Sequence, residues 1–257
     1  MGLLWLSIGS YARFVSNFHQ KCYTVVIHSM QQKVAFFDID GTVFRSSLLI
    51  EIVNALVKKG IFPSTAADGY KDEYNEWRNR EAGYEEYIKA VIRTFERNIK
   101  GVHYGDFADV GREVVKLQNK CVYRYTRDLI DKLKRQNYFI VAISQSPKTV
   151  VDEFCKSYGF DKVYGRMYEI GPTDKFTGQI TNEEVIGNKA NVVKRLLQND
   201  EFTLDNAVAV GDTENDVSML DMVAMPICFN PNYALYQHAK RMGWKVVVER
   251  KDVIYEI

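Results

Sequence analysis

Two aspartates separated by one residue follow a short apolar run near the start of the chain. The segment Lys33–Phe44 reads KVAFFDIDGTVF, with Asp38 and Asp40 directly after Val34–Phe37. The run predicts a buried strand and the Asp-Gly step a turn, which places both carboxylates where open α/β sheets bind ligands. Such anions repel by about 4 kcal/mol at about 4 Å and an effective dielectric of about 20. A bound cation or a protonated carboxyl is therefore expected there, although a solvated acidic turn is the plain alternative.

Further polar residues stand at the ends of later apolar segments. Ser144 ends the run YFIVAIS, Lys189 lies in the first turn of a predicted helix, and GDTEND follows the run AVAV. The last motif contains Asp212, Asn215 and Asp216. Each is weak evidence alone, because a serine at a strand end is usually a helix cap and a lysine on a helix is usually solvated. The carboxyl ends of parallel strands meet at one edge of a sheet, so these residues can come together there.

Predicted strands and helices alternate along most of the chain, which favours a parallel sheet with right-handed crossovers. Strands are predicted at Val34–Phe37, Tyr138–Ser144, Lys162–Tyr168, Ala207–Val210, Ala224–Phe229 and Lys245–Val248, with a small hairpin at Phe176–Thr181. The helices of this region are predicted at Tyr125–Gln136, Pro147–Tyr158, Gly187–Gln198, Asn215–Met222 and Tyr233–Met242. The predicted fold class is α/β.

Residues 68–120 differ from the rest, since they are rich in Tyr, Arg, Glu and Lys and show helical periodicity without strand-like alternation. We interpret residues 47–122 as a helical insertion after the first strand, beginning with a helix at Ser47–Lys59, and residues 30–46 and 123–257 as the α/β core. The stripe Tyr84, Tyr87, Ile88, Val91 and Phe95 is interpreted as core packing. Residues 1–29 are predicted to be an appendage; the alternative is a weak interfacial anchor through Leu3, Leu4, Trp5, Phe14 and Phe18.

Composition excludes several classes of protein. A net charge of +1 over 257 residues gives no basic surface for nucleic acid. No segment approaches the roughly 20 apolar residues of a membrane helix, so no stable membrane insertion is expected. The four cysteines, at 22, 121, 155 and 228, lack metal-ligand spacing and predict free thiols in a reducing, cytoplasmic compartment. Oligomeric state is left open.

The motifs DIDGT, Ser144, Lys189 and GDTEND, in this order, resemble the four motifs of the haloacid dehalogenase superfamily. The resemblance extends from about Lys33 to the C-terminus. The 23-residue step from Lys189 to Asp212, the segment FTGQI and the tail CFNPN…GW resemble its phosphoserine-phosphatase-like branch. The resemblance to this family implies a Rossmann-like parallel sheet flanked by helices, with a helical cap inserted after the first strand.

The resemblance also implies roles for the polar residues. Asp38 would be the nucleophile that forms an aspartyl-phosphate, and Asp40 the general acid and base. Mg²⁺, which prefers oxygen ligands, would be held by Asp38, the main-chain carbonyl of Asp40, Asp212 and Asp216. The phosphate would be bound by Ser144, Lys189 and Asn215.

The substrate implied is a small phosphorylated metabolite. Ser47 stands where phosphoserine phosphatases carry a glutamate that holds the substrate's ammonium group, and Ser144-Gln145-Ser146-Pro147 replaces their Ser-Gly-Gly. Phosphoserine phosphatase is therefore an alternative, with Glu51 one helical turn away as a substitute. A phosphotransferase and a non-catalytic phospho-ligand binding module are further alternatives. The candidate cap contacts are Arg45, Arg78, Arg80, Arg93 and Arg97.

Overall fold

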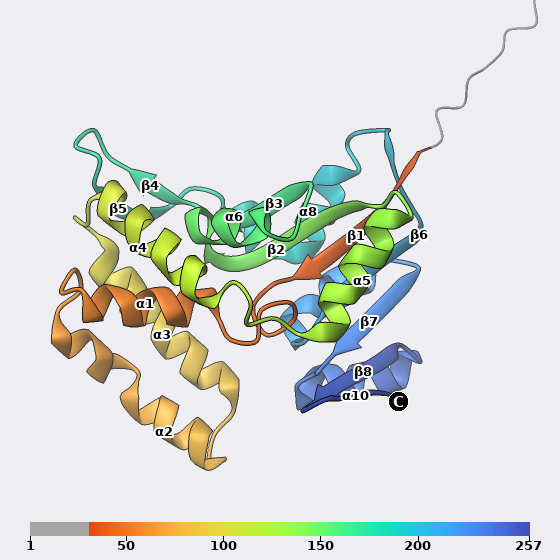
Figure 1. The fold of residues 1–257 in the computed structure, drawn as a ribbon, viewed down its shortest axis with the longest axis horizontal. Helices are drawn as coiled ribbons and strands as arrows, with labels where there is room; N and C mark the ends of the chain where they lie inside the picture. Colours follow the sequence, from red (N-terminus) through yellow and green to blue (C-terminus); the bar gives the residue numbers. More distant parts are fainter. Residues whose placement is uncertain (1–30) are drawn as a thin grey trace, which may run out of the picture. The chain divides into compact units, whose positions relative to one another are not determined.

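A seven-stranded sheet forms the centre of residues 31–257, the part of the chain that the computed structural model describes (Figure 1). The appendage predicted at residues 1–29, with its alternative as an anchor, lies outside the described residues. The strand order is β3-β2-β1-β6-β7-β8-β9, so β1 lies inside the sheet, between β2 and β6. The strands are β1 (Gln32–Asp38), β2 (Phe139–Pro147), β3 (Lys162–Arg166), β6 (Phe202–Gly211), β7 (Met225–Phe229), β8 (Lys245–Arg250) and β9 (Val253–Glu256).

The sheet is parallel except at one edge. There the prediction of a single last strand at Lys245–Val248 was incomplete, because β8 continues to Arg250 and pairs antiparallel with β9. The chain reverses at Lys251, which has a φ of 56°. The remaining neighbours pair in parallel, as expected for strands joined by helical crossovers.

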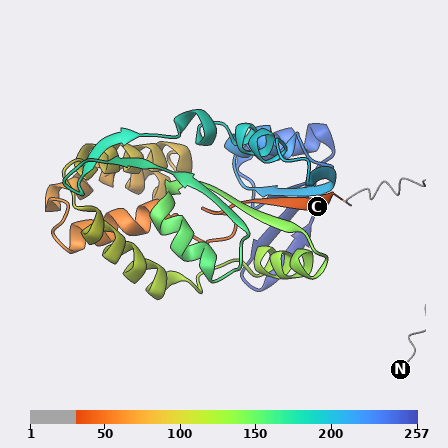
Figure 2. The same cartoon turned by 90° about the horizontal axis from the view of Figure 1, so that it is seen from above.

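Helices cover both faces of the sheet (Figure 2). Alternate residues of β1 divide between the two faces: Ala35 and Phe37 belong to one hydrophobic cluster, Val34 and Phe36 to the other. The first face is covered by α5 (Arg124–Arg135) and α6 (Lys148–Lys156). The second is covered by α7 (Glu183–Ile186), α8 (Lys189–Leu196), α9 (Val217–Leu220) and α10 (Tyr233–Met242).

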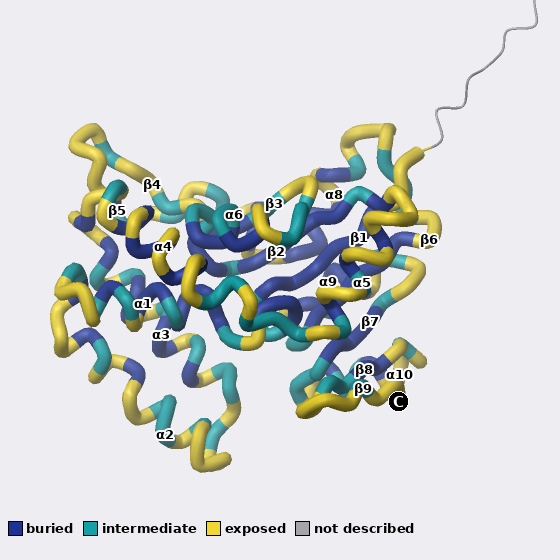
Figure 3. The backbone as a smooth tube through the Cα atoms, in the orientation of Figure 1, coloured by how far each residue is buried: buried dark blue, intermediate teal, exposed yellow. Residues whose placement is uncertain are grey.

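Burial on both faces explains why β1 is an unbroken apolar run rather than an alternating one. Figure 3 shows the central strands as the most deeply buried part of the backbone. Each fully buried Phe of β1 contributes about 1.5–3 kcal/mol relative to exposure. The predicted α/β class with a largely parallel, helix-flanked sheet is confirmed.

A second group of helices lies, in the chain, between β1 and β2. It consists of α1 (Leu48–Lys58), the 3₁₀ segment η1 (Ser64–Gly69), α2 (Lys71–Asn79), α3 (Tyr84–Ile99) and α4 (Tyr104–Gln118). These helices gather beyond the carboxyl end of β1 (Figure 1). We call them the cap helices; the division into a cap at 47–122 and a core at 30–46 and 123–257 stays a prediction.

A two-stranded hairpin, β4 (Tyr168–Ile170) and β5 (Phe176–Ile180), lies against the cap helices. The amide of Gly101 donates to the carbonyl of Phe176 at 2.8 Å, and the amide of Phe176 donates to Val102 at 2.9 Å. The Phe176 ring also packs edge-on against Phe107, with centroids 5.2 Å apart. The hairpin therefore connects the segment after β3 to the cap helices.

Candidate active site

The turn after β1 folds back tightly and brings Gly41 against Asp212. The carbonyl of Ile39 accepts hydrogen bonds from the amides of Val43 (3.0 Å) and Phe44 (2.8 Å). Gly41 has a φ of +87°, and a Cβ there would lie 2.2 Å from Oδ2 of Asp212. A glycine is thus required both by the backbone conformation and by the approach of the carboxylate.

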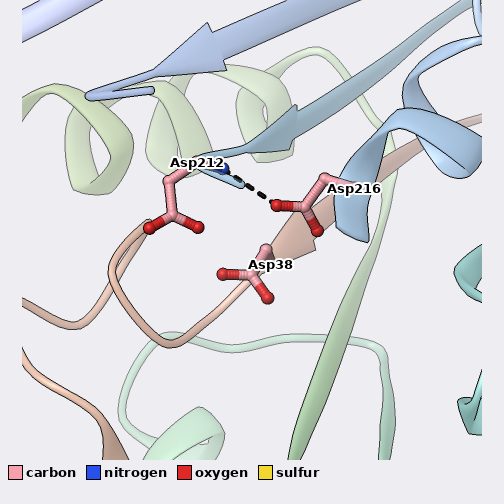
Figure 4. A group of neighbouring side chains, drawn as sticks. All are labelled: Asp38, Asp212 and Asp216. Carbon is pink, nitrogen blue, oxygen red and sulfur yellow. Dashed lines mark hydrogen bonds between the residues drawn. The ribbon is translucent and has the colours of Figure 1, made fainter. Parts of the chain in front are cut away.

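Three carboxylates meet at the carboxyl end of the sheet (Figure 4). They come from Asp38 at the end of β1, Asp212 after β6, and Asp216 in the 3₁₀ turn η2 (Glu214–Asp216); one oxygen of each lies within 4.8 Å of the others. The parallel register, with Phe37 opposite Val210, sets the ends of β1 and β6 side by side. Sequence reasoning proposed this convergence of distant residues.

Lys189 joins two of these carboxylates. It is the first residue of α8, where the side chain of Asn188 caps the helix by accepting from the amide of Ala190 at 3.0 Å. The Lys189 ammonium donates to Oδ1 of Asp38 at 2.5 Å and to Oδ1 of Asp216. All three side chains are buried, so the fold holds Lys189 as a fixed positive charge beside Asp38.

The two aspartates bound by Lys189 differ in their remaining oxygens. Oδ2 of Asp216 accepts from the amides of Asp212 (2.9 Å) and Thr213 (3.1 Å), so both of its oxygens have donors. Oδ2 of Asp38 is buried and, within residues 31–257, has no hydrogen-bond partner. An unpaired buried carboxylate oxygen is unfavourable by itself, so Asp38 is open to a ligand while Asp216 is held in place.

The electrostatics of the cluster favour a bound cation. Burial raises the pKa of Asp38 to about 7, with Lys189 opposing the shift and Asp216 and Asp40 adding to it. Burial, followed by Asp38 and Asp216, also raises the pKa of Asp212. Burial lowers the pKa of Lys189, but the two carboxylates outweigh it and keep the pKa above its usual value. One ammonium therefore faces three carboxylates, and an all-oxygen donor set with an unpaired oxygen fits a hard cation such as Mg²⁺.

The carboxylate of Asp40 points to a different set of partners. Its Oδ1 accepts from the amide of Leu48, the first residue of α1, at 2.6 Å. Its Oδ2 accepts from the hydroxyls of Ser144 and Ser146, the latter at 3.0 Å. Burial raises the pKa of Asp40, and the hydrogen bonds from Ser144, Leu48 and Ser146 oppose that shift. Its metal contact through the main chain stays a prediction.

The remaining site residues include two that sequence reasoning missed. Ser146 follows Ser144 by two residues in β2. Residues two apart in a strand point to the same face, so the motif SQSP already indicated that Ser146 lies beside Ser144. Thr42 donates to Oδ1 of Asp212 at 3.3 Å. Asn215 is exposed in η2. The phosphate-binding roles of Ser144, Lys189 and Asn215 stay predictions.

Comparison with known proteins identifies the family. The family model of the haloacid dehalogenase-like hydrolases matches residues 35–221. The chain belongs to this family. It is 24% identical to the inhibition of morphological differentiation protein of Streptomyces azureus, over 86% of this chain and 79% of that protein. It is 21% identical to the histidinol-phosphatase of Neisseria meningitidis serogroup C, over 84% and 98% of the two chains.

Phosphoserine phosphatases are also among the relatives. That of Methanocaldococcus jannaschii is 22% identical, over 87% of this chain and 95% of that protein. A solved structure of a phospho-aspartyl intermediate analogue of phosphoserine phosphatase superposes with a TM-score of 0.56 at 20% identity, covering 86% and 95% of the two chains. The chain is thus a hydrolase of the phosphoserine-phosphatase-like branch, as the motifs indicated.

In this haloacid dehalogenase-like hydrolase a cavity of about 1240 Å³ adjoins the carboxylates, with Gly41 and Asp212 in its wall. Ser47, at the position of the phosphoserine-phosphatase glutamate, is buried, whereas Glu51 lines the cavity. Of the candidate arginines, Arg45 and Arg80 line it. In the described chain its wall does not include Arg78, Arg93 or Arg97.

Proposed function

We propose that this protein is a Mg²⁺-dependent phosphatase that hydrolyses the phosphate monoester of a small metabolite through an aspartyl-phosphate. The observation that carries the proposal is the contrast between two neighbouring carboxylates. Asp38 has an unpaired oxygen beside a fixed ammonium, and Asp40 is held apart by hydroxyl and amide donors. A covalent mechanism needs one carboxylate that is free to attack and a second one that transfers protons. The phosphatases among the relatives support the proposal.

In the first half of the reaction an oxygen of Asp38 attacks phosphorus, and the bond from phosphorus to the ester oxygen breaks. Asp40 gives its proton to the departing alkoxide, which leaves as an alcohol. The raised pKa of Asp40 supports this role, because more of the acid form is present near neutral pH than for an exposed aspartate. In the second half Asp40 accepts a proton from water, which attacks the phosphoryl group and releases Asp38 and inorganic phosphate.

Lys189 would stabilise the negative charge of the phosphoryl group while it moves, since it stays protonated between Asp38 and Asp216. Asp38, Asp212, Asp216 and the main chain of Asp40 would hold Mg²⁺, which when bound supplies charge neutralisation. Asp216 would act mainly by positioning Lys189 and the amides after β6.

The test is hydrolysis of p-nitrophenyl phosphate with Mg²⁺ and with EDTA. Turnover should require Mg²⁺ and disappear in Asp38→Asn, while Asp205→Asn, an exposed change on β6, should match the wild type. Unchanged turnover in Asp38→Asn would exclude the covalent mechanism. If added acceptor alcohols collect the phosphoryl group, the protein is a phosphotransferase. Beryllofluoride bound at Asp38 without turnover of any ester would instead indicate a binding module.

We also propose a cytoplasmic location. Cys121, Cys155 and Cys228 are free thiols, as a reducing compartment would keep them; Cys22 lies outside the described residues. Along residues 31–257 the helices are too short or too polar to cross a bilayer.

A further inference from the structure

A second cavity lies where the β4–β5 hairpin meets α4 and the start of α6 (Figure 1). We call it the hairpin cavity. Its volume is about 480 Å³, which is in the range of small-molecule sites, about 300–1,000 Å³. Within residues 31–257 its wall shares no side chain with the cavity beside the carboxylates. The hairpin cavity is therefore a separate place in the fold where a ligand can be held.

One side of the hairpin cavity is apolar and is built around Phe176 of β5. The Phe176 ring packs edge-on against Tyr104 and Phe107 of α4, with centroids 5.9 and 5.2 Å apart. Three large apolar side chains of the wall, Tyr104, Met167 and Ile170, are exposed to solvent. Exposed apolar side chains that gather over a cavity are typical of a binding surface. This side of the wall therefore suits a ligand with an apolar part.

The same wall contains a buried positive charge, Arg166, at the end of β3. Arg166 pairs with Pro147 of β2, which sets it beside the start of α6. It is only 8% exposed. Its terminal nitrogens lie 3.6 Å from Glu96 and 3.5 Å from Glu183, longer than the roughly 2.7–2.9 Å of a good charge-assisted hydrogen bond. Its Nε has no hydrogen-bond partner within residues 31–257. A buried guanidinium that is paired so loosely favours a further anionic acceptor.

Three further cations line the hairpin cavity: Arg112 on α4, and Lys148 and Lys156 on α6. Each forms an ion pair with a carboxylate three or four residues away on its own helix. Such surface pairs contribute little stability, so an incoming anion can compete with them. Asp152 and Glu153 also line the cavity, and the described wall thus sets four cations against two carboxylates. The amides in the first turn of α6 add to this preference for an anion.

We propose that the hairpin cavity is a second ligand site, which binds small anions that carry an aromatic or other apolar group. The anionic group lies against Arg166 and the first turn of α6, and the apolar group lies against Phe107, Met167 and Phe176. An inorganic anion or an uncharged apolar molecule would use only one half of this wall, whereas a ligand with both parts uses the whole. The inference is independent of the proposed phosphatase function, because the described wall residues take no part in the proposed reaction.

The test compares 4-phenylbutyrate with its uncharged isostere 4-phenylbutanamide, by calorimetry on the full-length protein. The carboxylate should bind about tenfold more tightly than the amide. Met167→Glu places a negative charge at an exposed position of the wall, and should weaken the binding of phenylbutyrate by about tenfold. Met225→Glu is the matched control, since Met225 is 40% exposed against 45% for Met167 and lies on β7, and it should leave the affinity unchanged.

Arg166→Gln should weaken the binding of phenylbutyrate to a similar extent. It also leaves Glu96 and Glu183 without their cation, so its fold is checked by circular dichroism, and Met167→Glu decides the location if Arg166→Gln does not fold. Three results would overturn the inference: an amide that binds as tightly as the carboxylate, no saturable binding of either compound, or the same affinity for phenylbutyrate in Met167→Glu and Met225→Glu.

Discussion

Replacing Asp38 with Asn is expected to stabilise the metal-free protein although it removes the proposed nucleophile. Asp38 is 6% exposed, and its Oδ1 accepts from Lys189 at 2.5 Å. Lys189 is shared with Asp216, so one positive charge serves two buried anions. An asparagine at position 38 keeps an oxygen that can accept from Lys189 and removes the negative charge. The other oxygen of Asp38 has no hydrogen-bond partner in the described chain, so nothing there offsets that charge.

The size and sign follow from the pKa of Asp38, which burial raises from 3.8 to about 7. The folded state binds this proton more tightly than the unfolded state does. The free energy of unfolding therefore falls as pH rises from about 4 to about 7 and levels off above that. A pKa change of this size corresponds to about 4 kcal/mol in the free energy of unfolding. Asp38→Asn should be more stable than wild type by about that much at pH 8, and by only about 1 kcal/mol near pH 4.5.

Urea unfolding in EDTA at both pH values measures this difference. Asp205→Asn is the matched control, since it removes an exposed carboxylate on β6 and should change the free energy of unfolding by less than about 0.5 kcal/mol. An Asp38→Asn protein that is no more stable than wild type at pH 8, or whose advantage is the same at both pH values, would refute the account of Asp38 as an uncompensated buried charge.

Three further substitutions test other contacts of the site. Gly41→Ala should destabilise the folded protein by about 1–3 kcal/mol and lower kcat more than tenfold, because the added Cβ would displace the carboxylate of Asp212. Thermal melts measure the stability, and p-nitrophenyl phosphate kinetics measure kcat. Ser146→Ala removes a hydrogen bond that lowers the pKa of Asp40, so the alkaline limb of the kcat profile should move to higher pH; an unmoved limb would argue against Asp40 as the acid. Lys189→Met should cost about 3–5 kcal/mol at pH 8 in EDTA, and less at pH 5, where Asp38 is largely protonated; equal losses at both pH values would contradict the charge argument.

The sequence was sufficient to predict which residues meet, because the topology of a parallel sheet determines where its strand ends lie. Asp38, Asp212, Asp216 and Lys189 converge as expected from that rule. The topology of the sheet does not predict the orientation of each side chain. That Asp40 turns toward Ser144 and Ser146 depends on the hydrogen bonds available around it, which no spacing rule specifies.

The aromatic stripe of α3 shows a similar limit. Helical periodicity predicted core packing, and Tyr87, Val91 and Phe95 are indeed buried. Tyr84, one turn earlier on the same face, is half-buried and lines the cavity. Periodicity identifies the inward face of a helix, but where along that face the packing gives way to a cavity depends on the neighbouring elements.

The β4–β5 hairpin has a mechanical consequence. The cap helices are joined to the sheet by two chain segments, around residues 44–47 and 119–123, and main-chain hydrogen bonds at Gly101, Val102 and Phe176 make a third attachment. Any movement of the cap helices against the sheet must therefore carry the β4–β5 hairpin along, or else break those bonds and separate Phe176 from Phe107. The cap helices and the hairpin are thus expected to move as one unit, and the exposed side chains at the cavity rim, such as Arg80, Tyr233 and Arg250, can rearrange independently of that unit.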